Sequence, residues 1–277
     1  MTQSARRCVA GVHQGVGTMP SELQTERRGR TLVLTMSDPA TRNTLSAQLF
    51  AAGIEAISVA ESDAELRCLV LQGAGRHFCA GLHVAGLRER RAGDPALQMQ
   101  LVEHFHQFVE ALRACPKPVI AAVEGDAAGG GCSLALACDL VVAAEDARFV
   151  MSHARVGLTP DGGATWHLAQ MLPRQLALEW VWLGEALGAR QLQQHGIVNR
   201  VCDSGKALTE ACALAERLAL MAPNALAAGK ELVSRAPGHT LDRQMAVERN
   251  HFLEALLHPN AGEGLLAFAE KRPPRFR

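Results

Sequence analysis

The sequence predicts an α/β fold built from repeated units. A short β-rich run, a glycine-containing turn and a helical segment follow one another several times along the chain, without a strict period. With 277 residues and 48% hydrophobic content, the chain is long and apolar enough to bury a substantial core. We therefore expect a core over residues 21–205, a mostly helical region over residues 206–277 and a tail over residues 1–20.

The first two units are expected within residues 31–90. Ser46 is a favourable N-cap for the first helix, because its hydroxyl can accept a hydrogen bond from an unpaired amide of the first turn. The predicted elements are a strand at Thr31–Met36, a helix at Ser46–Ala60, a strand at Cys68–Gln72, a second short strand near Phe78 and a helix after Gly81.

The later units follow the same plan, and helices dominate beyond about Ala189. The predicted elements are strands at Pro118–Val123, Leu140–Ala144 and Ala147–Met151, and helices at Ser133–Cys138, after Gly162-Gly163, and at Ala207–Met221, Ala225–Ser234 and Leu241–His258. A C-terminal part this rich in alanine and leucine cannot bury itself alone, so we expect it to pack on the core or on a neighbouring subunit.

Composition excludes several classes of protein. Lys and Arg number 28 and Asp and Glu also 28, so no net charge attracts nucleic acid or an anionic membrane. No apolar run reaches the ~18 residues of a membrane span, and the eight cysteines show neither a C-x-x-C pair nor a metal-ligand spacing. We expect a cytoplasmic protein without a metal. Residues 1–20 are expected to be disordered, although their composition is also typical of a weak transit peptide, with Met19 as an alternative start.

The most informative feature is the triplet Gly129-Gly130-Gly131, which lies between an apolar strand and a helix. Glycine lets a ligand approach the backbone closely, and a helix start offers unpaired amides to a negative oxygen. That oxygen belongs either to a phosphate or to a thioester carbonyl becoming an enolate. The turn ending at Gly81 offers a second amide, and it is not a dinucleotide fingerprint, which would need glycine at Phe78.

Several polar residues have two interpretations. Asp161 is either the N-cap of the following helix or an acid whose pKa is raised by an apolar pocket of Leu158 and Trp166. Ser133, Asp161 and His167 follow the chain order of a serine hydrolase, but the second glycine of G-x-S-x-G is missing. His106 and His153 are by default partly buried histidines with satisfied hydrogen bonds.

Five ordered motifs resemble one known family. They are Phe78-Cys79-Ala80-Gly81, Lys117 to Gly131, Ala137-Cys138-Asp139, Gly157 to Gly163 and Glu263 to Phe276. They resemble the enoyl-CoA hydratase/isomerase (crotonase) superfamily from about residue 22 to the C-terminus. The resemblance implies a spiral of ββα units that binds an acyl-CoA, with C-terminal helices that form trimers or dimers of trimers.

The resemblance also implies roles for particular residues. The backbone amides of Leu82 and Gly130 would hold the thioester oxygen. Arg42 and Ala80 would contact the coenzyme A part of the substrate, and Phe268 with Lys271 would reach its nucleotide end. No further cofactor is implied, because coenzyme A enters with the substrate.

Departures from the family pattern indicate the reaction. The positions of the two glutamates of family hydratases hold Ser133 and His153, whereas Asp161 stands where some isomerases carry a carboxylate. The run P-D-G-G-x-T-W is most similar to the ring isomerases of phenylacetyl-CoA breakdown. The resemblance thus favours isomerisation by a proton shift that Asp161 carries out, with His153, Ser133, Trp166 and His106 in the substrate pocket.

Three alternatives stay open. A hydratase of low efficiency would work without both glutamates, and a binding subunit would hold coenzyme A without turnover. Aryl-CoA dehalogenases of the superfamily use an aspartate at the position of Asp161 as nucleophile, and His106-Gln107 matches a pair that they carry. They have tryptophan where this chain has His153. Most members also have an aspartate at the position of His83, which marks a difference near the coenzyme A end of the site.

Overall fold

The strands form two sheets. The computed structural model describes residues 22–277, so the tail expected at residues 1–20 lies outside the described residues. The six-stranded sheet has the order β1-β2-β3-β4-β6-β9. Strand β1 is antiparallel to β2, and all the remaining neighbours are parallel. The strands are, in this order, Glu22–Arg28, Thr31–Ser37, Cys68–Gly73, Val119–Val123, Leu140–Ala144 and Arg200–Cys202. The second sheet has the order β5-β7-β8, formed by Asp126–Ala128, Arg148–Val150 and Ala186–Gly188.

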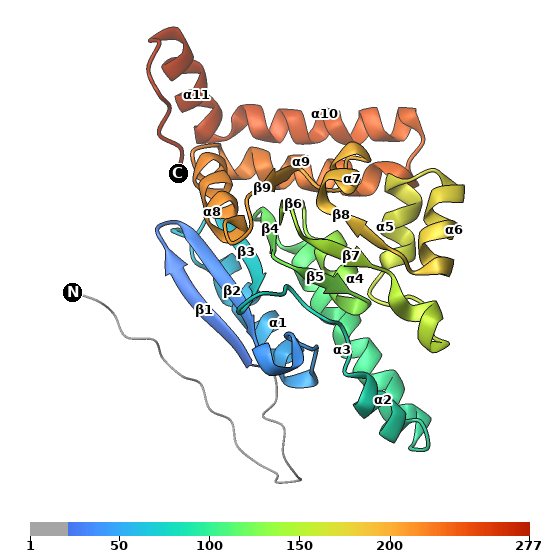
Figure 1. Cartoon of the computed structure of the whole chain (residues 1–277). Helices are drawn as coiled ribbons and strands as arrows, with labels where there is room; N and C mark the ends of the chain where they lie inside the picture. Colours follow the sequence, from blue (N-terminus) through green and yellow to red (C-terminus); the bar gives the residue numbers. More distant parts are fainter. Residues whose placement is uncertain (1–21) are drawn as a thin grey trace, which may run out of the picture.

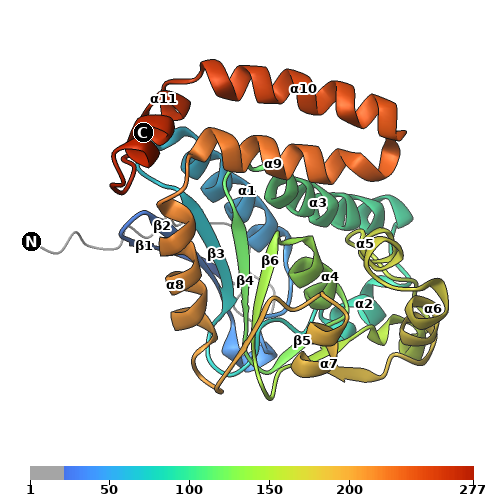
Figure 2. The same ribbon diagram turned by 90° about the horizontal axis from the view of Figure 1, so that it is seen from above.

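Helices cover both faces of the large sheet, which explains why its strands are apolar along their whole length. On one face Leu34 and Leu71 pack toward α1 (Ala47–Ser62) and α3 (Pro95–Ala114). On the other face Val33, Val70, Ile120 and Val142 pack against Ala207, Ala211 and Ala215 of α8 (Ala207–Ala219). Figure 2 shows α8 on one side of the strands and α1 with α3 on the other.

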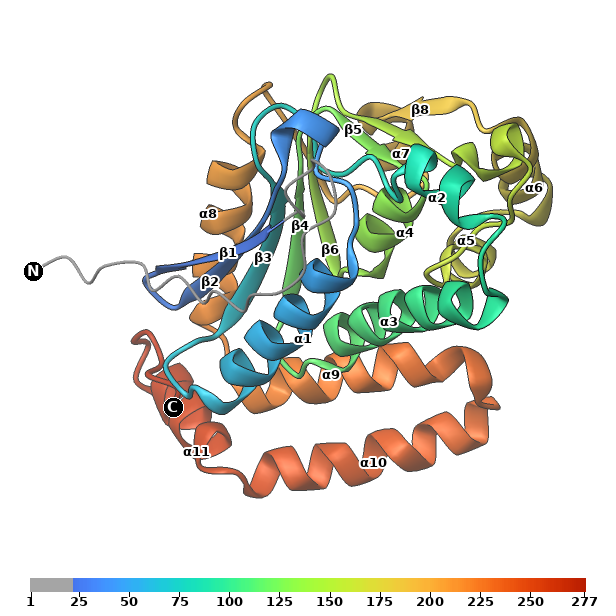
Figure 3. The ribbon, with the colours of Figure 1, turned by 90° about the horizontal axis from the view of Figure 1, so that it is seen from below.

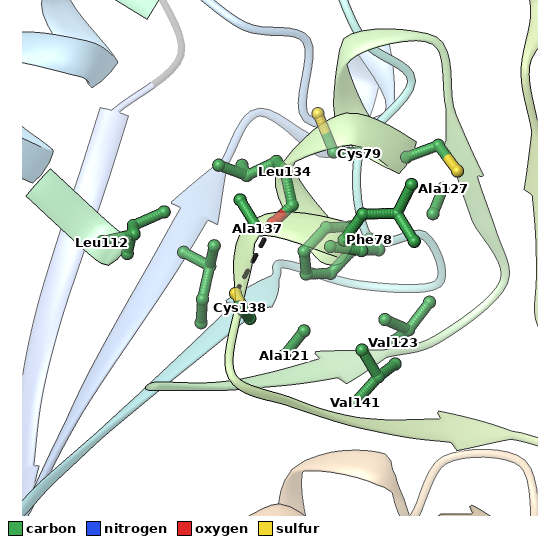
Figure 4. Close-up of a cluster of buried hydrophobic side chains, with 14 of the residues drawn as sticks. Phe78, Cys79, Leu112, Ala121, Val123, Ala127, Leu134, Ala137, Cys138 and Val141 are labelled. Carbon is green, nitrogen blue, oxygen red and sulfur yellow. Dashed lines mark hydrogen bonds between the residues drawn. The ribbon is translucent and has the colours of Figure 1, made fainter. Parts of the chain in front are cut away.

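Helix α4 (Gly130–Ala137) is buried along its whole length and carries the triple glycine into the core. Figure 4 shows Leu134 and Ala137 among Phe78, Ala121 and Val141, and Cys138 Sγ donates to the carbonyl oxygen of Leu134 at 3.5 Å. The start of α4 is therefore held in place by packing of the entire helix.

Most of the predicted elements are present, with bounds within three residues of those expected. The N-cap at Ser46 is confirmed, because its side chain accepts from the Leu49 amide. The strand predicted near Phe78 is wrong: only an isolated bridge between Cys79 and Ala127 forms there. The remaining helical segments are η1 (Pro39–Thr41), α2 (Val84–Arg90), η2 (Ser152–Val156), α5 (Ala164–Met171), α6 (Arg174–Leu183), α7 (Ala189–Gln194) and η3 (Ala236–Gly238).

The C-terminal helices form an outer layer. Helices α9 (Pro223–Arg235) and α10 (Leu241–Leu257) contain no buried residue, and α11 (Pro259–Ala269) follows at one end. Figure 3 shows α9 between α3 and α10. Lys230 links α9 to the core through two contacts. Its Nζ lies 2.8 Å from Asp139 Oδ2 and donates to the Leu112 carbonyl at 3.2 Å.

Candidate active site

Two glycine loops from separate units meet at the start of α4. Gly81 has φ +81°, and a Cβ there would lie 2.7 Å from the Ala128 carbonyl oxygen and 3.0 Å from the Gly130 nitrogen. A Cβ on Gly131 would lie 2.2 Å from the Cys79 carbonyl oxygen. Glycine is required at both positions because only a hydrogen atom fits between the two backbones. Leu82 follows Gly81 directly, so its amide belongs to the loop that meets the start of α4.

Both of these amides are available to a ligand. Gly130 is the first residue of α4, where an amide has no acceptor within the helix. Within residues 22–277, neither the Leu82 nor the Gly130 N–H donates to a protein acceptor. Gly129 fixes the turn before them with φ +52° and ψ −126°, and its own N–H donates to the Val150 carbonyl at 2.9 Å. Two amides without a protein acceptor, on loops that meet at the start of α4, are the donors that an oxyanion hole requires.

The carboxylate of Asp161 lies next to these donors. A Cβ on Gly130 would lie 3.5 Å from Asp161 Oδ1, and the Asp161 side chain is only 16% exposed. The capping interpretation of Asp161 is wrong. The N-cap of α5 is Gly163, and Asp161 offers this helix only its backbone carbonyl, which accepts from the Ala164 amide at 3.2 Å. The carboxylate oxygens of Asp161 therefore do not cap α5, and Oδ1 lies near the start of α4.

His153 is the hydrogen-bond partner of Asp161. Its Nε2 lies 3.3 Å from Asp161 Oδ1, and its side chain is 7% exposed. Ser133 is fully buried one turn into α4, and its hydroxyl donates to the Gly129 carbonyl at 3.3 Å. The serine-hydrolase interpretation is therefore wrong, because Ser133 is bonded to the backbone and Asp161 pairs with His153. Burial lowers the pKa of the third member of that order, His167, to about 4.

Apolar residues form one wall of the site beside Asp161. Trp166 and Leu158, which we expected there, are 42% and 48% exposed, and the Arg113 guanidinium lies 4.3 Å from the Trp166 ring centroid. Two further residues, which the sequence did not indicate, lie against Gly130. A Cβ on Gly130 would lie 3.0 Å from Leu45 Cδ1 and 3.4 Å from Phe105 Cε1. No local signal in the sequence marks them, since they reach the site from distant segments.

His106 follows Phe105 on α3 and is half-buried, with its ring centroid 6.4 Å from that of Phe105. The pair His106-Gln107 matches the dehalogenases in sequence, but His106 forms no hydrogen bond with the Asp161 carboxylate within residues 22–277.

The residues expected to bind coenzyme A separate into two groups. Arg42 and Ala80 line one cavity of about 320 Å³, together with Asp126, Arg148 and Arg155. Arg42 is 61% exposed at its side chain and lies 3.5 Å from Asp126 Oδ2, so its guanidinium is accessible to an anion.

Phe268 and Lys271 lie elsewhere. Phe268 is 87% exposed at the end of α11, and Figure 1 shows α11 at one end of the molecule, away from β5 and α4. Within one chain these two residues therefore do not share the cavity of Arg42.

Two further features bear on the chemistry. Within residues 22–277, no cluster of three or more His, Cys, Asp or Glu side chains is placed to hold a metal ion. In the same part of the chain, every helix is too short or too polar to cross a membrane.

The chain is similar to known proteins along nearly its whole length. A family model described as enoyl-CoA hydratase/isomerase matches residues 26–277. In Escherichia coli K12, a 1,2-epoxyphenylacetyl-CoA isomerase is 37% identical over 246 residues, which cover 88% of this chain and 94% of that protein. A 2,3-dehydroadipyl-CoA hydratase of the same organism is 37% identical over 257 residues, covering 93% and 99%.

A solved structure agrees with these relatives. The crystal structure of an enoyl-CoA hydratase from Polaromonas sp. JS666 is 49% identical, covers 92% of this chain and 99% of that one, and matches with a TM-score of 0.91. With the two glycine loops and a match over this length, the chain belongs to the enoyl-CoA hydratase/isomerase family and has the crotonase fold.

Proposed function

We propose that this enzyme isomerises an acyl-CoA thioester by a 1,3-proton shift, with Asp161 as the base. One observation carries the proposal: the Asp161 carboxylate lies beside the paired amides, at 3.5 Å from the position of a Gly130 Cβ. The positions of the two hydratase glutamates hold a buried serine, bonded to the backbone, and a histidine bonded to Asp161. A single carboxylate meets the needs of isomerisation, whereas hydration needs a second group to activate water.

The proposed reaction conserves atoms and charge. Asp161 removes a proton from a carbon next to the double bond, and the electron pair moves toward the thioester oxygen. The amides of Leu82 and Gly130 stabilise the resulting enolate, and one such donor contributes about 2.7–4 kcal/mol to a transition state. The protonated carboxyl then returns the proton two carbons away, which restores the thioester carbonyl and shifts the double bond.

The substrates in this proposal are unsaturated acyl-CoAs or a ring-bearing phenylacetyl-CoA derivative. The name of the relative 1,2-epoxyphenylacetyl-CoA isomerase supports the second class, and that of 2,3-dehydroadipyl-CoA hydratase supports a linear acyl chain. Coenzyme A enters as part of the substrate, in the cavity lined by Arg42 and Ala80. The proposal requires no other cofactor.

Solvent deuterium uptake tests the reaction. The wild type, Asp161→Asn and the matched control Asp146→Asn are incubated in D₂O with 3-enoyl-CoA and with phenylacetate-pathway thioesters. We expect exchange and double-bond migration to vanish in Asp161→Asn and to persist in Asp146→Asn, since Asp146 lies exposed in the turn between β6 and β7. Unchanged exchange in Asp161→Asn would reject the shuttle.

The products separate the alternatives. A 3-hydroxyacyl-CoA product would indicate a hydratase, and a stable ester on Asp161 would indicate the nucleophile of a dehalogenase. Binding of coenzyme A thioesters without turnover would indicate a binding subunit.

We also propose that the chain forms a trimer or a dimer of trimers through its C-terminal helices. Leu241, Met245, Phe252 and Leu256 on α10 are 73%, 50%, 70% and 48% exposed, and α10 contains no buried residue. Their spacing places them on one face of the helix, and an exposed apolar face of this kind is typical of an interface. Sedimentation velocity should give the mass of three or six chains, and Phe252→Glu should lower it; a monomer at micromolar concentration would contradict this proposal.

A further inference from the structure

His153 has one ring nitrogen bonded and one left alone. Nε2 lies 3.3 Å from Asp161 Oδ1, while Nδ1 is buried and has no hydrogen-bond partner among residues 22–277. The whole residue is only 6% exposed. A buried N–H without an acceptor is rare and costly, so the position of the protons on this ring is constrained by its surroundings.

Only one placement of protons on the His153 ring leaves no buried N–H without an acceptor. An imidazolium would place a proton on Nδ1 with no acceptor, and so would the neutral ring protonated only at Nδ1. In that second form the Nε2 lone pair would also face the Asp161 carboxylate, unless the carboxyl were protonated. The ring protonated at Nε2 alone donates to Oδ1 and leaves on Nδ1 only a lone pair.

We propose that His153 is a positioning residue, which donates its Nε2–H to Oδ1 of Asp161 and thereby leaves Oδ2 as the oxygen that takes and returns the proton. This inference rests on the proposed function of Asp161. A proton on Oδ1 would need an acceptor at Nε2, and that would move the ring proton to the unpartnered Nδ1. The histidine therefore holds the carboxylate in a fixed rotamer, with Oδ1 bonded to the ring and Oδ2 left for the proton transfer.

The surroundings hold the imidazole in this position. Its Nε2 and Cε1 atoms lie 3.7 and 3.9 Å from where a Cβ on Gly129 would be, so the ring edge rests against the backbone that begins α4. The backbone of His153 is fixed as well, because its carbonyl accepts from the Leu158 amide at 3.0 Å. A ring held on two sides can define the orientation of a carboxylate, which a catalytic group requires to within a fraction of an ångström.

Two substitutions of His153 distinguish a hydrogen bond donated to Asp161 from a side chain that only fills the volume. His153→Gln keeps an amide N–H at a position close to that of Nε2, whereas His153→Leu fills the volume without a donor. We expect His153→Leu to lower kcat for isomerisation about 10- to 100-fold, the scale of a misplaced catalytic group, with KM changed less than about threefold. His153→Gln should recover most of kcat.

The outcomes distinguish this inference from the proposed function. Isomerisation lost in Asp161→Asn but equal to wild type in His153→Leu would overturn the positioning role alone. Isomerisation retained in Asp161→Asn would overturn the proposed function itself. If both histidine variants lose kcat equally while thermal unfolding shows them folded, donation from Nε2 is refuted.

A spectroscopic measurement tests the tautomer without turnover. The enzyme is labelled with ¹⁵N-histidine, and the His153 signals are assigned by their absence in His153→Gln. At pH 8 we expect the long-range ¹H–¹⁵N pattern of a neutral ring protonated at Nε2. A ring protonated at Nδ1, or at both nitrogens, would overturn the inference even if the kinetics agreed with it.

Discussion

Gly162→Ala tests whether the wall behind Asp161 is as closely packed as its geometry indicates. A Cβ at this position would lie 2.5 Å from Cε1 and 2.7 Å from Cζ of Phe105, at a residue with φ +58°. Carbon atoms in contact are normally about 3.5–4.0 Å apart, so the ring would have to move by about 1 Å. Phe105 has 0% exposure and its ring centroid lies 5.3 Å from that of Phe50, which leaves it little room.

The expected cost has two parts. Overpacking a core costs about 1–3 kcal/mol, and the left-handed backbone conformation adds about 1–2 kcal/mol for alanine. The variant should therefore lose about 2–5 kcal/mol in free energy of unfolding. Because Gly162 follows Asp161 directly, a shift of about 1 Å should also lower kcat by up to about 100-fold.

The control is Gly196→Ala, which shares the backbone conformation but not the contact. Gly196 has φ +76° and nothing within 4 Å of its Cβ position, so only the backbone cost of about 1–2 kcal/mol applies. Urea unfolding compares the two variants through their midpoints at a constant slope. Adding Phe105→Leu to Gly162→Ala should restore part of the loss. Equal destabilisation of the two alanine variants would refute the reasoning.

Three further predictions concern buried or partly buried ionisable groups. Partial burial raises the pKa of Asp139, which pairs with Lys230 at 2.8 Å; Lys230→Met should cost about 1–3 kcal/mol in urea unfolding and expose α9 to proteolysis, and Lys230→Met with Asp139→Asn should cost less. Burial lowers the pKa of His167 to about 4 from the 6.5 of an unfolded chain. The unfolded state then binds the proton more tightly, so stability should fall by up to about 3 kcal/mol as the pH drops from 6.5 to 4; a His167→Gln variant with an unchanged pH dependence would contradict this. Burial raises the pKa of the Cys79 thiol to about 12, so iodoacetamide at pH 8 should modify the half-buried Cys212 well before Cys79, as peptide mass spectrometry can show.

Elements with a strong local signal could be predicted from the sequence. The apolar strand Cys68–Gly73 and the helix capped by Ser46 form nearly where the pattern indicates, because continuous burial and N-capping depend on neighbouring residues. The edge strand β1, Glu22–Arg28, was not anticipated because six of its seven residues are exposed and four are charged. The three-residue strand Asp126–Ala128 was also missed, since only its pairing with β7 makes it a strand.

The sequence by itself indicated candidate positions for the oxyanion hole and for the base that we propose. Glycines at 81 and 129–131 and an aspartate at 161 can be recognised one position at a time, from their residue types and from the motifs around them. Only the tertiary structure decided that Gly81 meets Gly130, that Asp161 pairs with His153 rather than capping α5, and that Leu45 and Phe105 form the wall. These contacts join distant parts of the chain, and packing of the whole core sets their distances, which no local pattern encodes.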